Sequence, residues 1–69
     1  MAQMGNPTLA PEDVELLRLL AAGLAVETVA RRMSLSDRTV RRRTRSICNR
    51  LGVTSPIQAV VWAARRGLV

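Results

Sequence analysis

The apolar residues of this chain recur at helical intervals, and the clearest case is the stretch 36–51. The members of its apolar strip return every three or four positions: Val40, Thr44, Ile47 and Leu51. This spacing places them on one face of an α-helix. Arginines gather on the opposite face. The pattern therefore predicts an amphipathic helix that buries a narrow strip and holds several guanidinium groups in solvent.

Both ends of this helix are marked in the sequence. Ser36 precedes the periodic pattern, and its hydroxyl can accept a hydrogen bond from the backbone N–H of Arg38 or Thr39. Gly52 follows the pattern and suits the left-handed conformation that often ends a helix. We therefore expect the helix to run from about residue 37 to 51.

Three shorter helices are predicted around it, at about residues 11–22, 26–33 and 56–66. Pro11 and Pro56 suit the first helical position, because the N–H that proline lacks has no intrahelical partner there. The expected buried residues are Val14 or Leu16, with Leu17, Leu20 and Ala21, in the first helix, Val29, Ala30 and Met33 in the second, and Ala59, Val60 and Ala63 in the last. These patterns together predict an all-α domain of four helices.

The connection between the second helix and the central one is only about three residues long, Ser34, Leu35 and Ser36. Two helices joined by so short a turn cross steeply, as in a helix-turn-helix motif, whose second helix enters the major groove of DNA. An ordinary helical hairpin is the alternative, although its second helix would not need so many arginines facing outwards.

Charge is distributed unevenly along the chain. Residues 1–30 hold one arginine against four acids, and residues 31–69 hold ten arginines against one acid. A solvated face is the usual explanation for surface charge, but charges gathered in this way are typical of a surface that binds a polyanion. Guanidinium groups suit phosphates and the edges of guanine. The central helix is therefore predicted to be a DNA recognition helix.

Composition excludes several other functions. The chain has 69 residues, no histidine or tyrosine, and one cysteine, so it lacks the residues for a metal site or a nucleophile–base pair, and neither an enzyme nor a cofactor is expected. Cys48 lies beside the apolar strip, where cysteine usually packs as a small hydrophobe, and a redox-sensing thiol is the alternative. Since neither an apolar run of about 18 residues nor a signal peptide is present, we expect a cytoplasmic protein without a membrane partner.

The last predicted helix has more apolar residues than one face can hold. Ile57, Val61 and Trp62 project away from its expected core strip. A second apolar face on a small helical domain often marks a partner surface. A protein-interaction module that docks through this face, with its arginines on acidic protein, is therefore an alternative to DNA binding.

Several short motifs together resemble the LuxR/FixJ-type helix-turn-helix of bacterial transcription regulators. They are spread over residues 8–69 and comprise Leu9-Ala10-Pro11-Glu12-Asp13-Val14-Glu15-Leu16-Leu17, Gly23-Leu24, Val29-Ala30-Arg31-Arg32-Met33, Leu35-Ser36, Thr39-Val40-Arg41, Leu51-Gly52-Val53 and Gln58-Ala59-Val60. The resemblance implies a four-helix domain whose second and third helices form the motif and whose fourth makes a symmetric dimer on DNA. Region 4 of a sigma factor, which reads promoters with a similar motif, is the nearest alternative.

The resemblance also implies roles for individual residues. Base contacts are expected from Arg41, Arg42 and Arg45. Contacts to the DNA backbone are expected from Ser36, Thr39 and Arg50. Arg38 and Asn49 lie on the same side of the helix as the base-contacting arginines, and they are also expected to contact the backbone. The second apolar face of the last helix, rather than the resemblance, indicates the residues of the dimer surface, which is expected to comprise Ile57, Val61, Trp62 and Arg65. We expect a weak homodimer that double-stranded DNA strengthens, with RNA polymerase as a further candidate partner.

The sequence departs from the family pattern at three positions. Ala10 and Ala25 stand where the family usually has capping hydroxyls, so the first two helices are expected to fray. Thr44 replaces a common apolar core residue. Most family members also carry an N-terminal receiver or ligand-binding domain. We expect residues 1–7 to be a flexible tail and residues 8–69 to be the DNA-binding domain, either stand-alone or cut from a larger regulator.

Overall fold

The computed structural model describes residues 9–69, which form four α-helices: α1 (Pro11–Ala21), α2 (Val26–Met33), α3 (Asp37–Leu51) and α4 (Pro56–Arg65). Within this range no strand occurs. The flexible tail predicted for residues 1–7 lies outside the described residues. The predicted all-α class is confirmed, and the helix bounds expected from the sequence are correct to within one residue.

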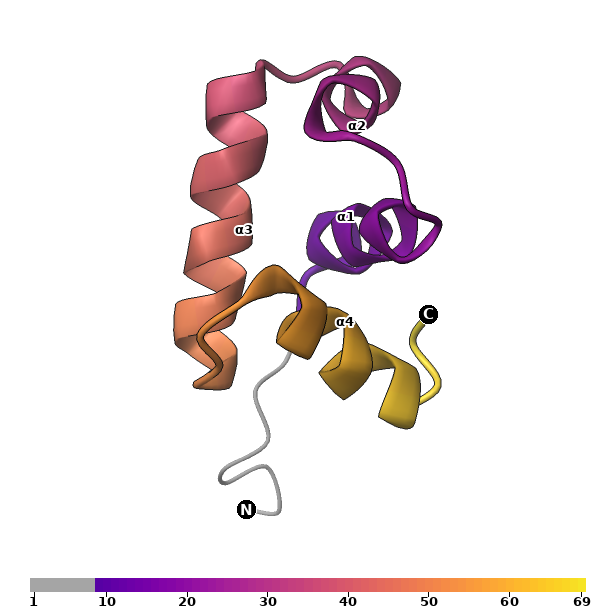
Figure 1. The fold of residues 1–69 in the computed structure, drawn as a ribbon, viewed down its shortest axis with the longest axis vertical. Helices are drawn as coiled ribbons and strands as arrows, with labels where there is room; N and C mark the ends of the chain where they lie inside the picture. The colour runs from indigo at the N-terminus through magenta and orange to yellow at the C-terminus, as the bar shows by residue number, and fades with distance from the viewer. Residues whose placement is uncertain (1–8) are drawn as a thin grey trace.

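The longest helix, α3, runs along the other three (Figure 1). α1 lies between α2 and α4 and contacts each of the other helices, whereas α2 and α4 do not contact one another in the described chain (Figure 1). All three shorter helices thus pack on the same side of α3. Its opposite side is left to solvent.

The first two helices begin without a side-chain cap, as predicted. Ala10 and Ala25 occupy the capping positions in extended conformations, and neither has a polar side chain to offer the free N–H groups. In α1 the carboxylate of Asp13 offsets part of this loss, because its Oδ2 accepts a hydrogen bond from the backbone N–H of Ala10 at 3.3 Å. A carboxylate in the first turn is also favoured by the helix dipole.

The turn between α2 and α3 is as tight as the sequence predicts. Ser34 ends α2 in the left-handed conformation, with φ 58°, and is the sole non-glycine residue of the described chain with a positive φ. The N–H of Leu35 then donates to the carbonyl of Ala30 at 2.8 Å. This arrangement satisfies carbonyl groups at the end of α2 and lets α3 leave at a steep angle, so α2 and α3 form a helix-turn-helix.

The core draws on all four helices. Its buried apolar residues are Leu16, Leu17, Leu19, Val29, Ala30, Val40, Ile47, Cys48, Ala59 and Ala63. Two residues of α1 contradict the prediction, because Leu19 is buried and Ala21 is exposed. Four residues that were expected to be buried are half-buried against the core instead: Leu20, Met33, Leu51 and Val60. α1 contacts three helices, so its buried surface is wider than one strip, and Ala21 lies at its end, beyond these contacts.

Thr44 lies in the core where the family usually has an apolar residue. It is buried, and its hydroxyl donates to the carbonyl of Val40 at 2.8 Å. A buried hydroxyl costs little when it has such a partner. The substitution is therefore accommodated within α3 itself, and the side of the helix that faces solvent is unaffected.

Candidate nucleic-acid interface

The solvent side of α3 carries a stripe of polar side chains that recur every three or four residues. This base stripe consists of Arg38, Arg41, Arg42, Arg45 and Asn49, all of them exposed. Within residues 9–69 none of the five forms an ion pair or a side-chain hydrogen bond. Four guanidinium groups therefore project from one surface with their donors free.

The N-terminal end of α3 is held by Ser36, as predicted. Its Oγ accepts a hydrogen bond from the backbone N–H of Thr39 at 3.1 Å and donates to Thr39 Oγ1 at 2.9 Å. Since Thr39 Oγ1 is the acceptor in this pair, its own proton remains available to an external acceptor. The cap thus fixes the helix start and orients a hydroxyl donor beside the base stripe.

A second row of polar residues lies along one flank of the base stripe. This flank stripe comprises Thr39, Arg43, Ser46 and Arg50, again at intervals of three or four residues. Arg43 and Ser46 did not appear among the sequence-predicted contacts, although their spacing from Thr39 and Arg50 would have revealed them. Ser46 is exposed. The Arg43 side chain is half-buried, so part of it lies against the protein and the rest is available on this flank.

Arg50, at the C-terminal end of the flank stripe, is in an ion pair. Its Nη1 lies 3.2 Å from Oδ2 of Asp13 in α1. The Arg50 side chain is 46% exposed and that of Asp13 only 15%. The pair therefore ties the end of α3 to the beginning of α1 and leaves much of the guanidinium accessible.

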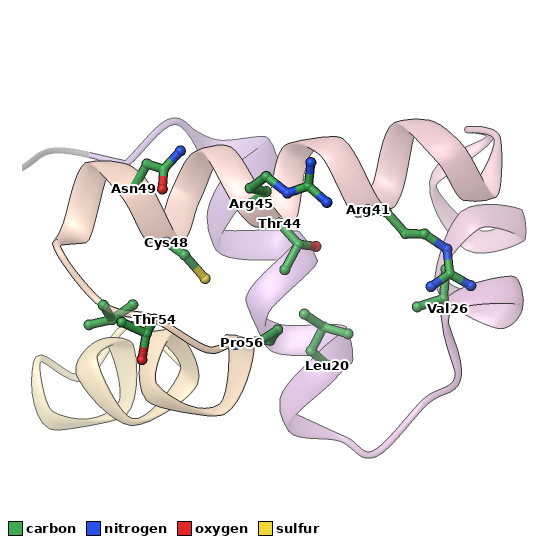
Figure 2. Close-up of a pocket in the computed structure, with 10 residues that line it drawn as sticks. Leu20, Val26, Arg41, Thr44, Arg45, Cys48, Asn49, Thr54 and Pro56 are labelled. Atoms are coloured by element: carbon green, nitrogen blue, oxygen red, sulfur yellow. The ribbon is translucent and has the colours of Figure 1, made fainter.

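The other flank of α3 borders a hollow of about 530 Å³ between α3, the end of α1 and the start of α4. Figure 2 shows Thr44 and Cys48 pointing into it from α3, opposite Leu20 and Pro56. Cys48 is buried, and this burial raises the pKa of its thiol above the ordinary value. A protonated thiol is a poor nucleophile, so the structure favours the packing role over redox sensing.

The outer face of α4 is apolar, as the sequence predicts. Ile57 and Val61 are 66% and 42% exposed and border a shallow hollow of about 460 Å³, together with Arg65. Trp62 was expected to project away from the core like Ile57 and Val61, and this prediction was wrong in part. Its side chain is half-buried, and the guanidinium of Arg66 lies 4.0 Å from the centroid of its ring. The arginine covers the ring in a cation–π contact.

Other kinds of site have little support in the described part of the chain. Among residues 9–69 no group of three or more His, Cys, Asp or Glu side chains could hold a metal ion. None of the described helices is long and apolar enough to cross a membrane. The feature that stands out is the combination of base stripe and flank stripe on α3.

Comparison with known proteins agrees with this geometry. The family model for bacterial regulatory proteins of the luxR family matches residues 7–63. The transcriptional regulatory protein YdfI of Bacillus subtilis (strain 168) is 34% identical over 67 residues, which cover 97% of this chain and 32% of YdfI. The probable HTH-type transcriptional regulator GfsR of Streptomyces halstedii is 38% identical over 65 residues, covering 90% of this chain and 27% of GfsR.

A further relative is the nitrate/nitrite response regulator protein NarL of Escherichia coli (strain K12). It is 30% identical over 54 residues, which cover 78% of this chain and 25% of NarL. The chain thus spans about a third or less of the length of these relatives. No solved structure matched the chain.

Proposed function

The chain belongs to the luxR family of bacterial regulatory proteins, and from this premise we propose that it binds double-stranded DNA in a sequence-specific manner with α3 in the major groove. The family resemblance inferred from the sequence motifs is confirmed, and with it the coarser function, DNA binding in transcription regulation. The finer proposal depends on one observation, the four exposed arginines of the base stripe, which have no ion-pair partner within residues 9–69.

Within the base stripe, we assign Arg41, Arg42 and Arg45 to the edges of the bases. Arginine suits this role because its planar fork can donate two hydrogen bonds to one guanine. Arg38 and Asn49, at the two ends of the stripe, are assigned to the DNA backbone.

The flank stripe is assigned to the phosphates of one strand. Thr39 offers a hydroxyl donor beside the start of α3, and Arg50 offers a partly exposed guanidinium near its end. Ser36 supports this contact by holding Thr39. Such contacts fix the position of a protein on DNA but carry no sequence information themselves.

We further propose that two copies bind DNA together through α4. The candidate interface is the outer face of α4, where Ile57, Val61 and Arg65 are exposed and Trp62 is half-buried. Two-fold symmetry would place the two copies of α3 in successive major grooves, about 10 base pairs apart. The binding site would then be an inverted repeat.

The division of roles can be tested by selecting bound sequences from a random duplex pool with single-alanine variants. Arg41→Ala, Arg42→Ala and Arg45→Ala should each relax the preference at particular base positions, by about 1–3 kcal/mol per lost arginine–guanine pair. Thr39→Ala and Arg50→Ala serve as controls, because the loss of a phosphate contact should weaken all sequences alike. Uniform loss of affinity in all five variants, with base preferences unchanged, would show that the base stripe does not read sequence.

A further inference from the structure

Asp13 and Arg50 are 37 positions apart in the chain and meet where the end of α3 passes the beginning of α1. Oδ2 of Asp13 accepts hydrogen bonds from Nη1 of Arg50 at 3.2 Å and from the backbone N–H of Ala10 at 3.3 Å. The Asp13 side chain is mostly covered and that of Arg50 is half-exposed. The carboxylate is therefore the fixed member of the pair, and the guanidinium is the member that faces outwards.

We infer that Asp13 is a positioning residue for DNA binding, which holds the guanidinium of Arg50 towards the phosphate backbone without touching DNA itself. This inference rests on the proposed function. A guanidinium carries five N–H donors, and within the described chain Asp13 engages only Nη1 of Arg50. Donors therefore remain for a phosphate while the side chain is already ordered.

The benefit of this arrangement is entropic. A free arginine side chain has many rotamers and loses most of them when it binds a phosphate. The base-stripe arginines have no protein partner within residues 9–69 and must bear that loss on binding. Arg50 has been restricted before DNA arrives, so its contact costs less conformational entropy.

The other ion pair of the described chain has neither a covered carboxylate nor a partner on the candidate interface. Arg18 and Glu15 are one turn apart on α1, and their side chains are 55% and 48% exposed. Exposed pairs of this kind contribute little to stability, and α1 carries no part of the candidate interface. The Asp13–Arg50 pair combines a covered carboxylate, a second hydrogen bond to Ala10 and a partner on the flank stripe.

Positioning and simple electrostatics predict opposite signs when the Asp13 carboxylate is removed. Loss of a negative charge should by itself strengthen binding to a polyanion. Loss of positioning should weaken it. Glu12 provides a matched control, because it lies in the same turn of α1, carries the same charge and is exposed.

The test compares the affinities of wild type, Asp13→Ala and Glu12→Ala for a 20-base-pair duplex of random sequence at one fixed low salt concentration, by fluorescence anisotropy. Random sequence suffices because a backbone contact is independent of sequence. We expect Glu12→Ala to bind as tightly as wild type or up to about two-fold tighter. Asp13→Ala should bind about three-fold to ten-fold more weakly, as expected when one arginine must be ordered on binding.

The variant Arg50→Ala shows whether Asp13 acts through Arg50. In that background the change Asp13→Ala should cause no further weakening. Thermal melting followed by circular dichroism verifies that each variant is folded at the temperature of measurement. Should Asp13→Ala melt too early, Asp13→Asn with Glu12→Gln replaces the pair, since asparagine keeps an oxygen for the N–H of Ala10.

Two outcomes would overturn this inference alone. One is that the Asp13 variant binds as tightly as its Glu12 control, and the other is that it weakens binding equally when Arg50 is absent. Failure of the wild-type chain to bind any duplex would instead overturn the proposed function, and the role of Asp13 with it.

Discussion

The variant Ile47→Ala is expected to be largely unfolded at ambient temperature. The Ile47 side chain is 1% exposed and lies in the centre of the core. Truncation of a buried isoleucine to alanine removes apolar burial and leaves a cavity, at a cost of about 2–5 kcal/mol. A domain of 69 residues has a total stability near the lower end of about 5–15 kcal/mol, so this loss approaches the whole margin.

The control is Ile57→Ala, the same chemical change at a side chain that is 66% exposed. It should melt close to wild type, because little apolar surface returns to water. Leu17→Ala, at another fully buried position, should behave like Ile47→Ala. Urea and thermal melts followed by circular dichroism measure all three. A cooperative melt of Ile47→Ala near that of wild type would show that the core is less dependent on α3 than its burial indicates.

The variant Val61→Glu is expected to keep its fold and to lose cooperative binding to an inverted repeat. Val61 lies on the exposed face of α4, so a charge there is tolerated in the monomer. Across a two-fold axis the two glutamates would face one another and repel. Because linkage of two binding events can raise affinity by a factor of about 10²–10⁴, loss of the interface should have a large effect on the paired site.

A duplex with a single half-site is the internal control, and there Val61→Glu should bind like wild type. The free wild-type chain should sediment mainly as a monomer, since a patch on one short helix falls well below the roughly 1,200–2,000 Å² of stable complexes. Unchanged cooperativity of Val61→Glu on the inverted repeat would place the interface between copies elsewhere.

Local signals explain why the helix bounds could be predicted from the sequence. Ser36 caps α3 and Gly52 ends it in the left-handed conformation, and both effects depend only on residues within one turn. The burial pattern of α1 was harder to predict. Whether Leu19 or Ala21 is buried depends on the positions of three other helices, and no periodicity within α1 encodes them.

The base stripe on α3 could be predicted because one helical period fixes which residues share a face. The flank stripe was predicted only in part, since Arg43 and Ser46 lie between the base stripe and the core and were assigned to neither. The Asp13–Arg50 pair joins residues 37 positions apart, so local spacing gives no sign of it. Contacts with DNA and between copies depend on molecules outside the chain and remain predictions.

The most direct test of DNA binding by α3 is the affinity of the wild-type chain for a duplex measured at several salt concentrations. Each phosphate that a cationic side chain neutralises releases condensed counterions, so the logarithm of the binding constant should fall linearly with the logarithm of salt concentration, by about 0.9 per neutralised phosphate. Among the residues proposed to contact the backbone, Arg38, Arg43 and Arg50 are cationic, and together they give a slope of about −3 for each copy bound. A slope near zero would contradict DNA binding and favour a module that docks on protein through the apolar face of α4.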